Sequence, residues 1–279
     1  LFKGVCWKKM NFIETQCPAK INLFLRVLNK RIDGYHNIET SFQLVDLCDL
    51  MSFERTTDEI IIESNKDFLR GQDNTIFTSA SKIKEYLSDK EYGVKISIQK
   101  NIPTGSGMGG GSSNAASTII ALNKLWNLNL SENKLISIAK EIGADVPFFM
   151  FGKNALGTGI GDELQETSSI KKNILVIDPL IHNSSKNMFN LLEEWKENKN
   201  NSLSKQNHFL NVFIEKNEEV KDFVKNTGKN YSINLTGSGS CMFICYKDDK
   251  EINEILKKIP SKWRLFFCKP LQYSPICYI

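Results

Sequence analysis

The sequence contains few of the residues that usually hold metal ions or form disulfide frameworks. It has three histidines, His36, His182 and His208, which lie far apart, and its seven cysteines include no C-x-x-C pair. Zinc sites need ligands at short, regular spacings, and disulfide frameworks are typical of short secreted chains. We therefore expect no structural zinc and no disulfides, and we interpret the cysteines as reduced, mostly buried thiols.

Long apolar runs and a strong excess of one charge are also missing. No stretch approaches the roughly 18 apolar residues that a membrane span requires. Residues 1–10 contain three lysines but no hydrophobic run behind them, so we expect no secretory signal and a cytoplasmic protein. The net charge of +4 is small and evenly spread, which does not indicate nucleic-acid binding. Neither a membrane nor a nucleic acid is therefore an expected partner.

The composition that remains is that of a large globular protein, with 279 residues of which 41% are hydrophobic and 24% charged. Its local patterns mix strands and helices throughout, and they restart near residues 160–170. Strands are expected at 21–27, 40–53, 60–62, 94–100, 148–151, 173–178, 231–235 and 241–246. Helices are expected at 75–87, 115–126, 131–142, 185–195, 217–225 and 251–259. These patterns predict an α+β protein with two lobes, at residues 1–165 and 166–279.

The most unusual segment is a glycine-rich loop between a predicted strand and a predicted buried helix. Residues 101–117 read NIPTGSGMGGGSSNAAS, with five glycines between positions 105 and 111. Glycines let the backbone approach a ligand closely, and the free N–H groups at a helix start favour negative charge. A flexible linker seldom connects a strand to a buried helix, so the segment predicts a phosphate-binding loop.

Neither of the two commonest phosphate-binding motifs accounts for this loop. Gly105, Gly107 and Gly110 satisfy G-x-G-x-x-G, but no strand ending in an acidic residue follows about 20 residues later, as dinucleotide binding requires. The nucleotide-binding pattern G-x-x-x-x-G-K-S would need a lysine at position 111, where the chain has Gly111.

The loop instead resembles the phosphate loop of the GHMP small-molecule kinases, whose members phosphorylate galactose, homoserine, mevalonate or phosphomevalonate. Three further regions resemble this family in the same order: PAKINLFL at 18–25 followed by DGYH at 33–36, GADVP at 143–147, and LTGSGSC at 235–241. The first of these is similar to the members that act on a cytidine diphosphate-linked methylerythritol. The resemblance covers most of the chain.

The resemblance implies a two-lobed fold, with a ribosomal S5 domain 2-like N-terminal lobe, a ferredoxin-like C-terminal lobe and the active site between them. It implies ATP-dependent phosphorylation of the 2-hydroxyl of the cytidylyl substrate, a step of the non-mevalonate isoprenoid pathway. ATP and Mg²⁺ are the cofactors it implies. The metal would bridge the phosphates, with Ser113 as the one candidate protein ligand.

The resemblance also assigns roles to individual residues. Asp145 is expected to take the proton from the hydroxyl, and Lys20 to orient and polarise it. The residues expected to bind ATP are Asn74, Lys100, Pro103, Thr104, Gly105, Ser106, Gly107, Met108, Gly109, Gly110, Gly111, Ser112 and Ser113.

On the substrate side, the aromatic ring of Tyr35 is expected to stack on cytosine, and His36 to hydrogen-bond the edge of the base. Phe189, with Ser185 nearby, would supply the opposite stacking face. Asn22 is expected near the reacting hydroxyl. The residues Gly237, Ser238 and Gly239 would form a second glycine loop over the phosphates or the methylerythritol end.

Simpler interpretations stay open at this point. Asp145 can be a turn former, Lys20 a surface residue and Asn74 only a helix cap. A kinase for homoserine or mevalonate, or a nucleotide-binding regulator without activity, would share the glycine loop. The segment around His182 departs from the family pattern, and the sequence does not distinguish a monomer from a homodimer.

Overall fold

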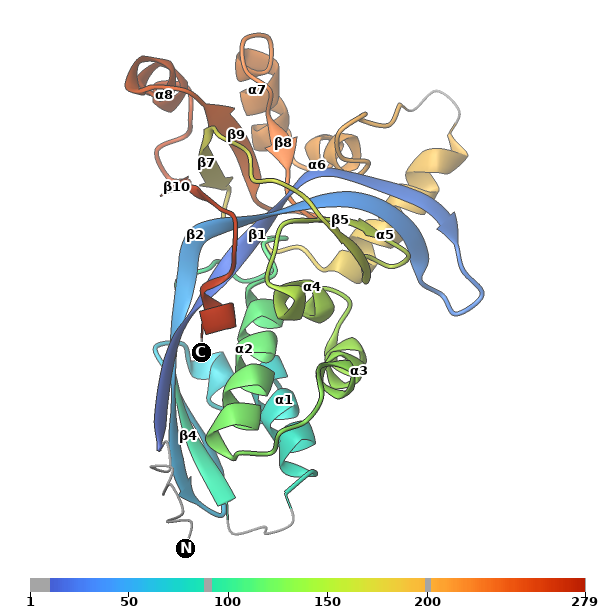
Figure 1. The fold of residues 1–279 in the computed structure, drawn as a ribbon. Helices are drawn as coiled ribbons and strands as arrows, with labels where there is room; N and C mark the ends of the chain where they lie inside the picture. Colours follow the sequence, from blue (N-terminus) through green and yellow to red (C-terminus); the bar gives the residue numbers. More distant parts are fainter. Residues whose placement is uncertain (1–10, 88–91, 199–201, 279) are drawn as a thin grey trace, which may run out of the picture.

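Two β-sheets with helices packed on them form the protein in this computed structural model, which describes residues 11–87, 92–198 and 202–278 (Figure 1). One sheet has seven strands and the other has four. Residues 1–10, on which the expectation about a secretory signal depends, lie outside the described residues.

The backbone of the first sheet is a pair of unusually long antiparallel strands, β1 (Phe12–Lys30) and β2 (His36–Thr57). The predicted turn at Asp33 and Gly34 joins them. Figure 1 shows the pair running from the N-terminal lobe, past the second sheet, to a projecting hairpin. The other strands of this sheet are β3 (Ile60–Ser64), β4 (Tyr92–Gln99), β5 (Ala155–Thr158), β6 (Glu163–Glu166) and β11 (Pro270–Leu271).

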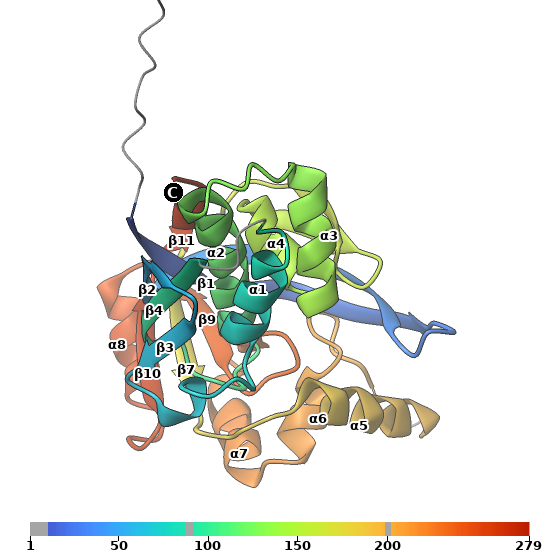
Figure 2. The ribbon, with the colours of Figure 1, turned by 90° about the horizontal axis from the view of Figure 1, so that it is seen from below.

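Four helices cover one face of this sheet, as Figures 1 and 2 show together. They are α1 (Thr75–Lys84), α2 (Gly110–Leu125), α3 (Glu132–Ile142) and α4 (Val146–Phe151), and a short 3₁₀ turn, η1 (Asp67–Leu69), precedes them. The predicted start of α1 is confirmed, since the Asn74 side chain accepts a hydrogen bond from the Phe77 amide at 2.9 Å. Apolar side chains of all four helices and of the sheet form the first hydrophobic core.

The strand predicted at residues 148–151 was wrong, because this segment is helix α4. Pro147 stands in its first turn, and Gly152 ends it with a left-handed φ of 68°. Both Phe148 and Phe149 are fully buried in the first core. A short, continuously apolar run fits a buried strand and a buried helix equally well, so periodicity could not distinguish them.

The second sheet has the strand order β10-β7-β9-β8. Its lobe contains β7 (Asn173–Asp178), α5 (Ser185–Glu197), α6 (Leu210–Glu215), α7 (Glu218–Thr227), β8 (Asn234–Leu235), β9 (Met242–Tyr246), α8 (Asp249–Leu256) and β10 (Arg264–Cys268). All neighbouring strands are antiparallel, and helices follow β7 and β9. This is the ferredoxin-like arrangement, so the expected two-lobed α+β fold is confirmed.

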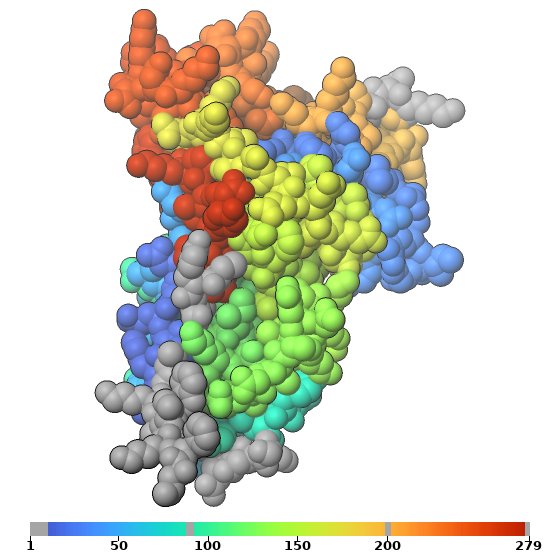
Figure 3. Space-filling model, in the orientation of Figure 1, coloured from blue at the N-terminus to red at the C-terminus, as the bar shows by residue number. Residues whose placement is uncertain are grey.

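After β10 the chain returns to the first sheet. There β11 pairs with β2, and the Ser274 amide donates to the Gly152 carbonyl at 2.8 Å. A 3₁₀ turn, η2 (Pro275–Tyr278), follows. In the space-filling view the red C-terminal residues lie against the yellow-green residues that follow α4 (Figure 3). The last described segment therefore packs on the N-terminal lobe.

The long strand pair contributes to more than one core. Leu25 and Val27 of β1 and Ile38 of β2 belong to the core that underlies α5–α8, whereas Phe42 and Phe53 belong to the first core. One continuous piece of sheet therefore connects the two cores. No helix in the described part of the chain combines the length and the apolar character needed to cross a membrane.

Candidate active site

A cleft of about 860 Å³ lies where the glycine-rich loop, the long strand pair and the C-terminal lobe meet. Its wall contains most of the residues predicted from the sequence. These are Lys20, Asn22, Tyr35, His36, Lys100, Pro103, Thr104, Gly105, Ser106, Gly107, Gly109, Gly110, Gly111, Ser112, Asp145, Ser185, Phe189, Gly237, Ser238 and Gly239.

The glycine-rich loop connects β4 to α2, as predicted. Gly109 caps α2 with a left-handed φ of 71°, and the helix begins at Gly110 with no acidic residue in its first turn. The first N–H groups of a helix have no partner inside the helix, and the helix dipole adds partial positive charge there. This wall of the cleft is therefore suited to an anion such as a phosphate.

A second glycine loop, residues 236–240 between β8 and β9, packs directly on the first. The Cys241 amide donates to the Ser106 carbonyl at 3.1 Å, and the Thr236 hydroxyl donates to the Gly107 carbonyl at 3.1 Å. A Cβ atom on Gly107 would lie 2.0 Å from the Thr236 carbonyl oxygen, so only glycine permits this contact. Each loop thus fixes the position of the other.

Lys20 and Asp145 meet at the cleft wall from different elements. Lys20 lies on β1, Asp145 is the N-cap residue of α4, and the Lys20 Nζ atom is 3.4 Å from Asp145 Oδ2. The lysine side chain is 3% exposed and the carboxylate 33% exposed. The cation is therefore supported from within the protein, while the carboxylate is open to a ligand.

Asn22 connects this pair to the second glycine loop. Its Oδ1 atom accepts hydrogen bonds from Lys20 Nζ at 2.7 Å and from the Gly237 amide at 2.8 Å. Its Nδ2 group donates to the Thr40 hydroxyl at 2.7 Å. Because both ends of the amide are engaged, Asn22 fixes the direction of the Lys20 ammonium in addition to lining the cleft.

The predicted base-binding residues gather around the hairpin. The rings of His36 and Phe189 stack with centroids 4.8 Å apart and planes 17° apart, and His36 Nε2 lies 3.4 Å from a Glu193 carboxylate oxygen. Tyr35 is 57% exposed beside them. A flat base can therefore meet aromatic side chains here.

The tip of the hairpin is held by its own hydrogen bonds. The Arg31 guanidinium and the Tyr35 amide both donate to the Asp33 carboxylate, and they lower the pKa of Asp33 below its usual value. The hydroxyls of Ser185 and Ser238 lie 3.0 Å apart, which joins α5 to the second glycine loop.

Three of the predicted ATP contacts do not line the cleft. The side chain of Asn74 caps α1 and donates to the carbonyl of Gly71, so its polar atoms are already used. Met108 is fully buried in the core between the sheets, and its carbonyl accepts from the Lys20 amide at 3.0 Å. Ser113 is fully buried within α2, while Ser112 reaches the cleft.

Sequence reasoning also missed residues that shape the site. Asn183 and Lys186 line the cleft, and Asn207 donates its Nδ2 hydrogens to the carbonyls of Leu235 and Gly237 at 2.7 and 2.9 Å. No local pattern identifies Asn207, because its partners lie in a loop that is distant in the sequence.

The described residues do not form a magnesium site by themselves. Asp145 is the one carboxylate among the residues that line the cleft, and no group of three His, Cys, Asp or Glu side chains in the described ranges can hold a metal ion. The Ser113 hydroxyl is buried away from the cleft. These donors fit a metal ion that is already bound to phosphates, and they do not form a complete metal site without the phosphates.

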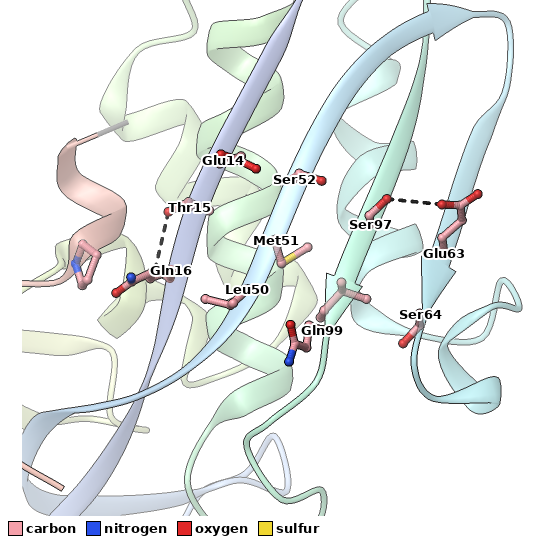
Figure 4. Close-up of a pocket in the computed structure, with 12 residues that line it drawn as sticks. Glu14, Thr15, Gln16, Leu50, Met51, Ser52, Glu63, Ser64, Ser97 and Gln99 are labelled. Carbon is pink, nitrogen blue, oxygen red and sulfur yellow. Dashed lines mark hydrogen bonds between the residues drawn. The ribbon is translucent and has the colours of Figure 1, made fainter.

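A second hollow, of about 850 Å³, lies on the other side of the first sheet (Figure 4). Side chains of β1, β2, β3 and β4 form it, among them Glu14, Leu50, Ser52, Ser97 and Glu63. Its described lining contains two carboxylates and no lysine or arginine, so it lacks the positive charge that a phosphate site needs. The cleft between the lobes is therefore the candidate active site.

Comparison with known proteins shows the family of this chain. The family model described as GHMP kinases N terminal domain matches residues 74–153, and GHMP kinases C terminal matches residues 185–265. A 4-diphosphocytidyl-2-C-methyl-D-erythritol kinase of Francisella tularensis subsp. holarctica is 38% identical over 263 residues, which cover 91% of this chain and 95% of that protein. One of Marinomonas sp. is 33% identical over 95% of this chain and 90% of that protein.

Solved structures show the same fold. A crystal structure of 4-(cytidine 5'-diphospho)-2C-methyl-D-erythritol kinase, 25% identical, covers 92% of this chain and 99% of its own, with a TM-score of 0.72. Homoserine kinase from Cytophaga hutchinsonii has a TM-score of 0.71 over 97% of this chain and 98% of its own, at 16% identity, which speaks for the fold alone. Both family models lie on the lobes that form the cleft, and the chain accordingly belongs to the GHMP kinases and, within them, to the 4-diphosphocytidyl-2-C-methyl-D-erythritol kinase family.

Proposed function

We propose that this protein transfers the γ-phosphoryl group of ATP to the 2-hydroxyl of 4-diphosphocytidyl-2-C-methyl-D-erythritol, in the non-mevalonate route to isoprenoids. One observation carries the proposal: the Lys20–Asp145 pair opens onto a cleft whose adjoining wall is a phosphate-binding loop. The relatives with this name cover nearly the whole chain and support the choice of substrate.

The nucleotide is proposed to bind with its phosphates against the glycine-rich loop and the start of α2. Lys100, which lines the cleft beside Gly110, would add positive charge there. Phe68 and Leu69 line the same cleft, and Phe68 is 56% exposed. These apolar side chains offer a surface for the adenine ring.

The chemistry follows from the two charged groups. The substrate hydroxyl donates its proton to the exposed carboxylate of Asp145 as its oxygen forms a bond to the γ-phosphorus, and the bond from that phosphorus to the β-phosphate oxygen breaks to release ADP. The Lys20 ammonium, held by Asn22, is positioned to orient the hydroxyl and to offset the negative charge of the transferred group.

The cytidine end is proposed to bind at the hairpin. Phe189 and Tyr35 would contact the faces of cytosine, and His36 its hydrogen-bonding edge. Because His36 and Phe189 are already stacked, the base would either replace this contact or extend it. Ser185 and the Gly237–Ser238–Gly239 segment lie between the hairpin and the glycine-rich loop in the cleft lining, where the diphosphate would pass.

Mg²⁺ is proposed to enter with ATP. When bound it would reduce the negative charge of the β- and γ-phosphates, and this chain offers the hydroxyl of Ser112, in the first turn of α2, in the cleft lining. We also propose that the lobes divide as residues 1–165 and 166–279. We propose in addition that the protein is cytoplasmic and that it is a monomer or a homodimer.

The test is an assay of ADP release with Mg·ATP and four alcohols offered separately: the cytidylyl methylerythritol, mevalonate, homoserine and galactose. ADP formed with the cytidylyl substrate alone is the expected result. Turnover of another alcohol would overturn the substrate assignment but would still show that the protein is a kinase. ATP binding without turnover of any alcohol would favour a nucleotide-binding regulator. An Asp145→Asn variant is the control that gives the background rate of ADP release.

A further inference from the structure

A fully buried carboxylate lies behind the glycine-rich loop. It belongs to a residue that is not among the site residues predicted from the sequence. Asp49, in the middle of β2, has an exposed fraction of 0%. Its Oδ1 atom accepts hydrogen bonds from the backbone amides of Asn101 and Ile102, at 2.8 and 2.9 Å. These two residues are the point at which the chain leaves β4 and enters the loop.

The other carboxylate oxygen contacts the far end of the loop. Asp49 Oδ2 accepts from Asn114 Nδ2 at 2.9 Å, and it forms an ion pair and hydrogen bond with Lys100 Nζ. Asn114 belongs to the first turns of α2 and is 1% exposed. Four donors fill the acceptor capacity of the carboxylate, so both ends of the loop are joined to one side chain.

The cation of this ion pair, Lys100, lies directly beside the start of α2. Lys100 is 7% exposed and lines the cleft, and its Nζ atom lies 2.7 Å from the position that a Cβ atom on Gly110 would take. Gly110 is the first residue of α2, whose free N–H groups face the anion site. Without Asp49, the buried ammonium would have no paired charge among its described contacts and would move toward solvent or toward the ligand.

From this arrangement we infer that Asp49 is a positioning residue for the nucleotide. It fixes the Lys100 ammonium and both ends of the glycine-rich loop in the geometry that receives the β- and γ-phosphates. The inference rests on the proposed function for the identity of the ligand, but it concerns ATP alone. All four contacts of Asp49 lie on the loop side, and none lies on the residues assigned to the cytidine end.

The experiment compares two variants of equally buried, ion-paired aspartates. Asp49→Asn keeps an acceptor for the two backbone amides but removes the charge that holds Lys100. Asp178→Asn is the matched control, because Asp178 is 2% exposed and its side chain contacts Arg264 on β10 and the Leu180 amide, and no residue of the glycine-rich loop. Binding of the β,γ-imido analogue of ATP is measured by calorimetry, and the KM of each substrate by the ADP assay.

We expect Asp49→Asn to weaken binding of the analogue and to raise the KM for ATP by about tenfold, with the KM for the alcohol within about twofold. Asp178→Asn should leave the affinity for the analogue unchanged. A variant with both Asp49→Asn and Lys100→Gln should bind no more weakly than Lys100→Gln alone, because Asp49 acts through the lysine.

Equal changes in both KM values, or the same loss of nucleotide affinity in Asp178→Asn, would overturn the inference and leave Asp49 a structural residue. If Asp49→Asn does not fold, Lys100→Gln removes the charge that Asp49 fixes, and unchanged affinity for the analogue in that variant would also contradict the inference. Wild-type protein that binds the analogue but phosphorylates no alcohol would refute the proposed function, while the ratio of affinities still decides this inference.

Discussion

The ammonium of Lys20 and the carboxylate of Asp145 lie 3.4 Å apart in the cleft wall, where the lysine side chain is 3% exposed and the carboxylate 33% exposed. Lys20 is held from behind by Asn22, which itself contacts the second glycine loop through Gly237. The pair is thus connected to both lobes at once. The proposed proton acceptor is therefore the more accessible of the two groups, while the lysine proposed to orient the hydroxyl is held from within the protein.

Replacing Asp145 by asparagine should lower kcat by roughly a thousandfold, since the amide is nearly isosteric but cannot accept the proton as a carboxylate does. The KM for ATP should change little, because Asp145 is separate from the glycine-rich loop. Steady-state kinetics would measure both. Asp162→Asn, which removes a carboxylate paired with Lys140 outside the cleft lining, is the control and should leave kcat unchanged. A parallel loss of ATP affinity and thermal stability would indicate a structural role for Asp145.

Replacing Phe189 by leucine should raise the KM for the cytidylyl substrate by about tenfold, because the leucine side chain has no flat face to stack on a base. The KM for ATP should stay within about twofold. Phe267→Leu alters a phenylalanine of β10 that is 58% exposed and outside the cleft lining, so it should change neither constant. Equal changes in the two KM values of Phe189→Leu would rule out a role in base binding.

The contact between the two glycine loops predicts a graded loss of stability. Gly107→Ala combines a φ of 75° with a Cβ atom 2.0 Å from the Thr236 carbonyl oxygen, and should cost more than about 2 kcal/mol in free energy of unfolding.

Two other glycines separate these causes. Gly34→Ala has a φ of 86° but no atom within 4 Å of its Cβ, so about 1 kcal/mol is expected. Gly71→Ala has neither problem and should stay within about 0.5 kcal/mol. Urea denaturation would measure all three variants. Equal losses of unfolding free energy for Gly107→Ala and Gly34→Ala would show that the contact between the two glycine loops contributes little to stability.

His208 predicts a dependence of stability on pH. Burial lowers the pKa of His208, and Lys196 and Arg26 act in the same direction. The Val27 amide donates to Nδ1 at 3.0 Å, so that nitrogen is unprotonated in the folded protein. The unfolded chain therefore binds a proton more readily, and stability contributed by the neutral ring is complete above the ordinary pKa of 6.5 and is lost as pH falls below it.

The measurement is the free energy of unfolding of wild type and His208→Asn between about pH 7.5 and about pH 5. The Oδ1 atom of asparagine can replace Nδ1 as the acceptor but does not titrate. We expect the wild type to lose more stability than the variant on acidification. Identical pH profiles would show that His208 titrates equally in both states.

The segments that the sequence predicted well have local causes. Asn74 and Ser131 cap the helices that were expected to begin beside them, and a strand, a glycine loop and a helix follow one another at residues 92–125. The Asp33–Gly34 turn likewise joins two strands. Capping, turn geometry and periodicity act over a few residues, and they can be recognised without knowledge of the rest of the chain.

The features that the sequence did not reveal depend on contacts between distant segments. Asp49 is one acidic residue in an apolar run, and nothing near it in the sequence indicates that Asn101, Ile102 and Asn114 will surround it. Asn207 supports the second glycine loop for the same kind of reason. The residue roles assigned to Lys20, Asp145, Tyr35, His36 and Phe189 came from the family resemblance, and they stay predictions until the kinetic tests.

The length of the β1–β2 pair has a consequence for which alcohols the enzyme can use. Lys20 and Asn22 lie partway along β1, while His36 stands opposite Lys30 at the far end of the same ladder. The distance between the proposed phosphorylation site at Lys20 and the proposed base-binding site at His36 is therefore set by hydrogen-bonded backbone. Deleting one residue from β1 between Asn22 and Lys30 would shorten this distance by about 3.3 Å and would turn the following side chains to the opposite face of the sheet. We therefore expect the length of a substrate, as well as its chemical groups, to determine whether it is phosphorylated.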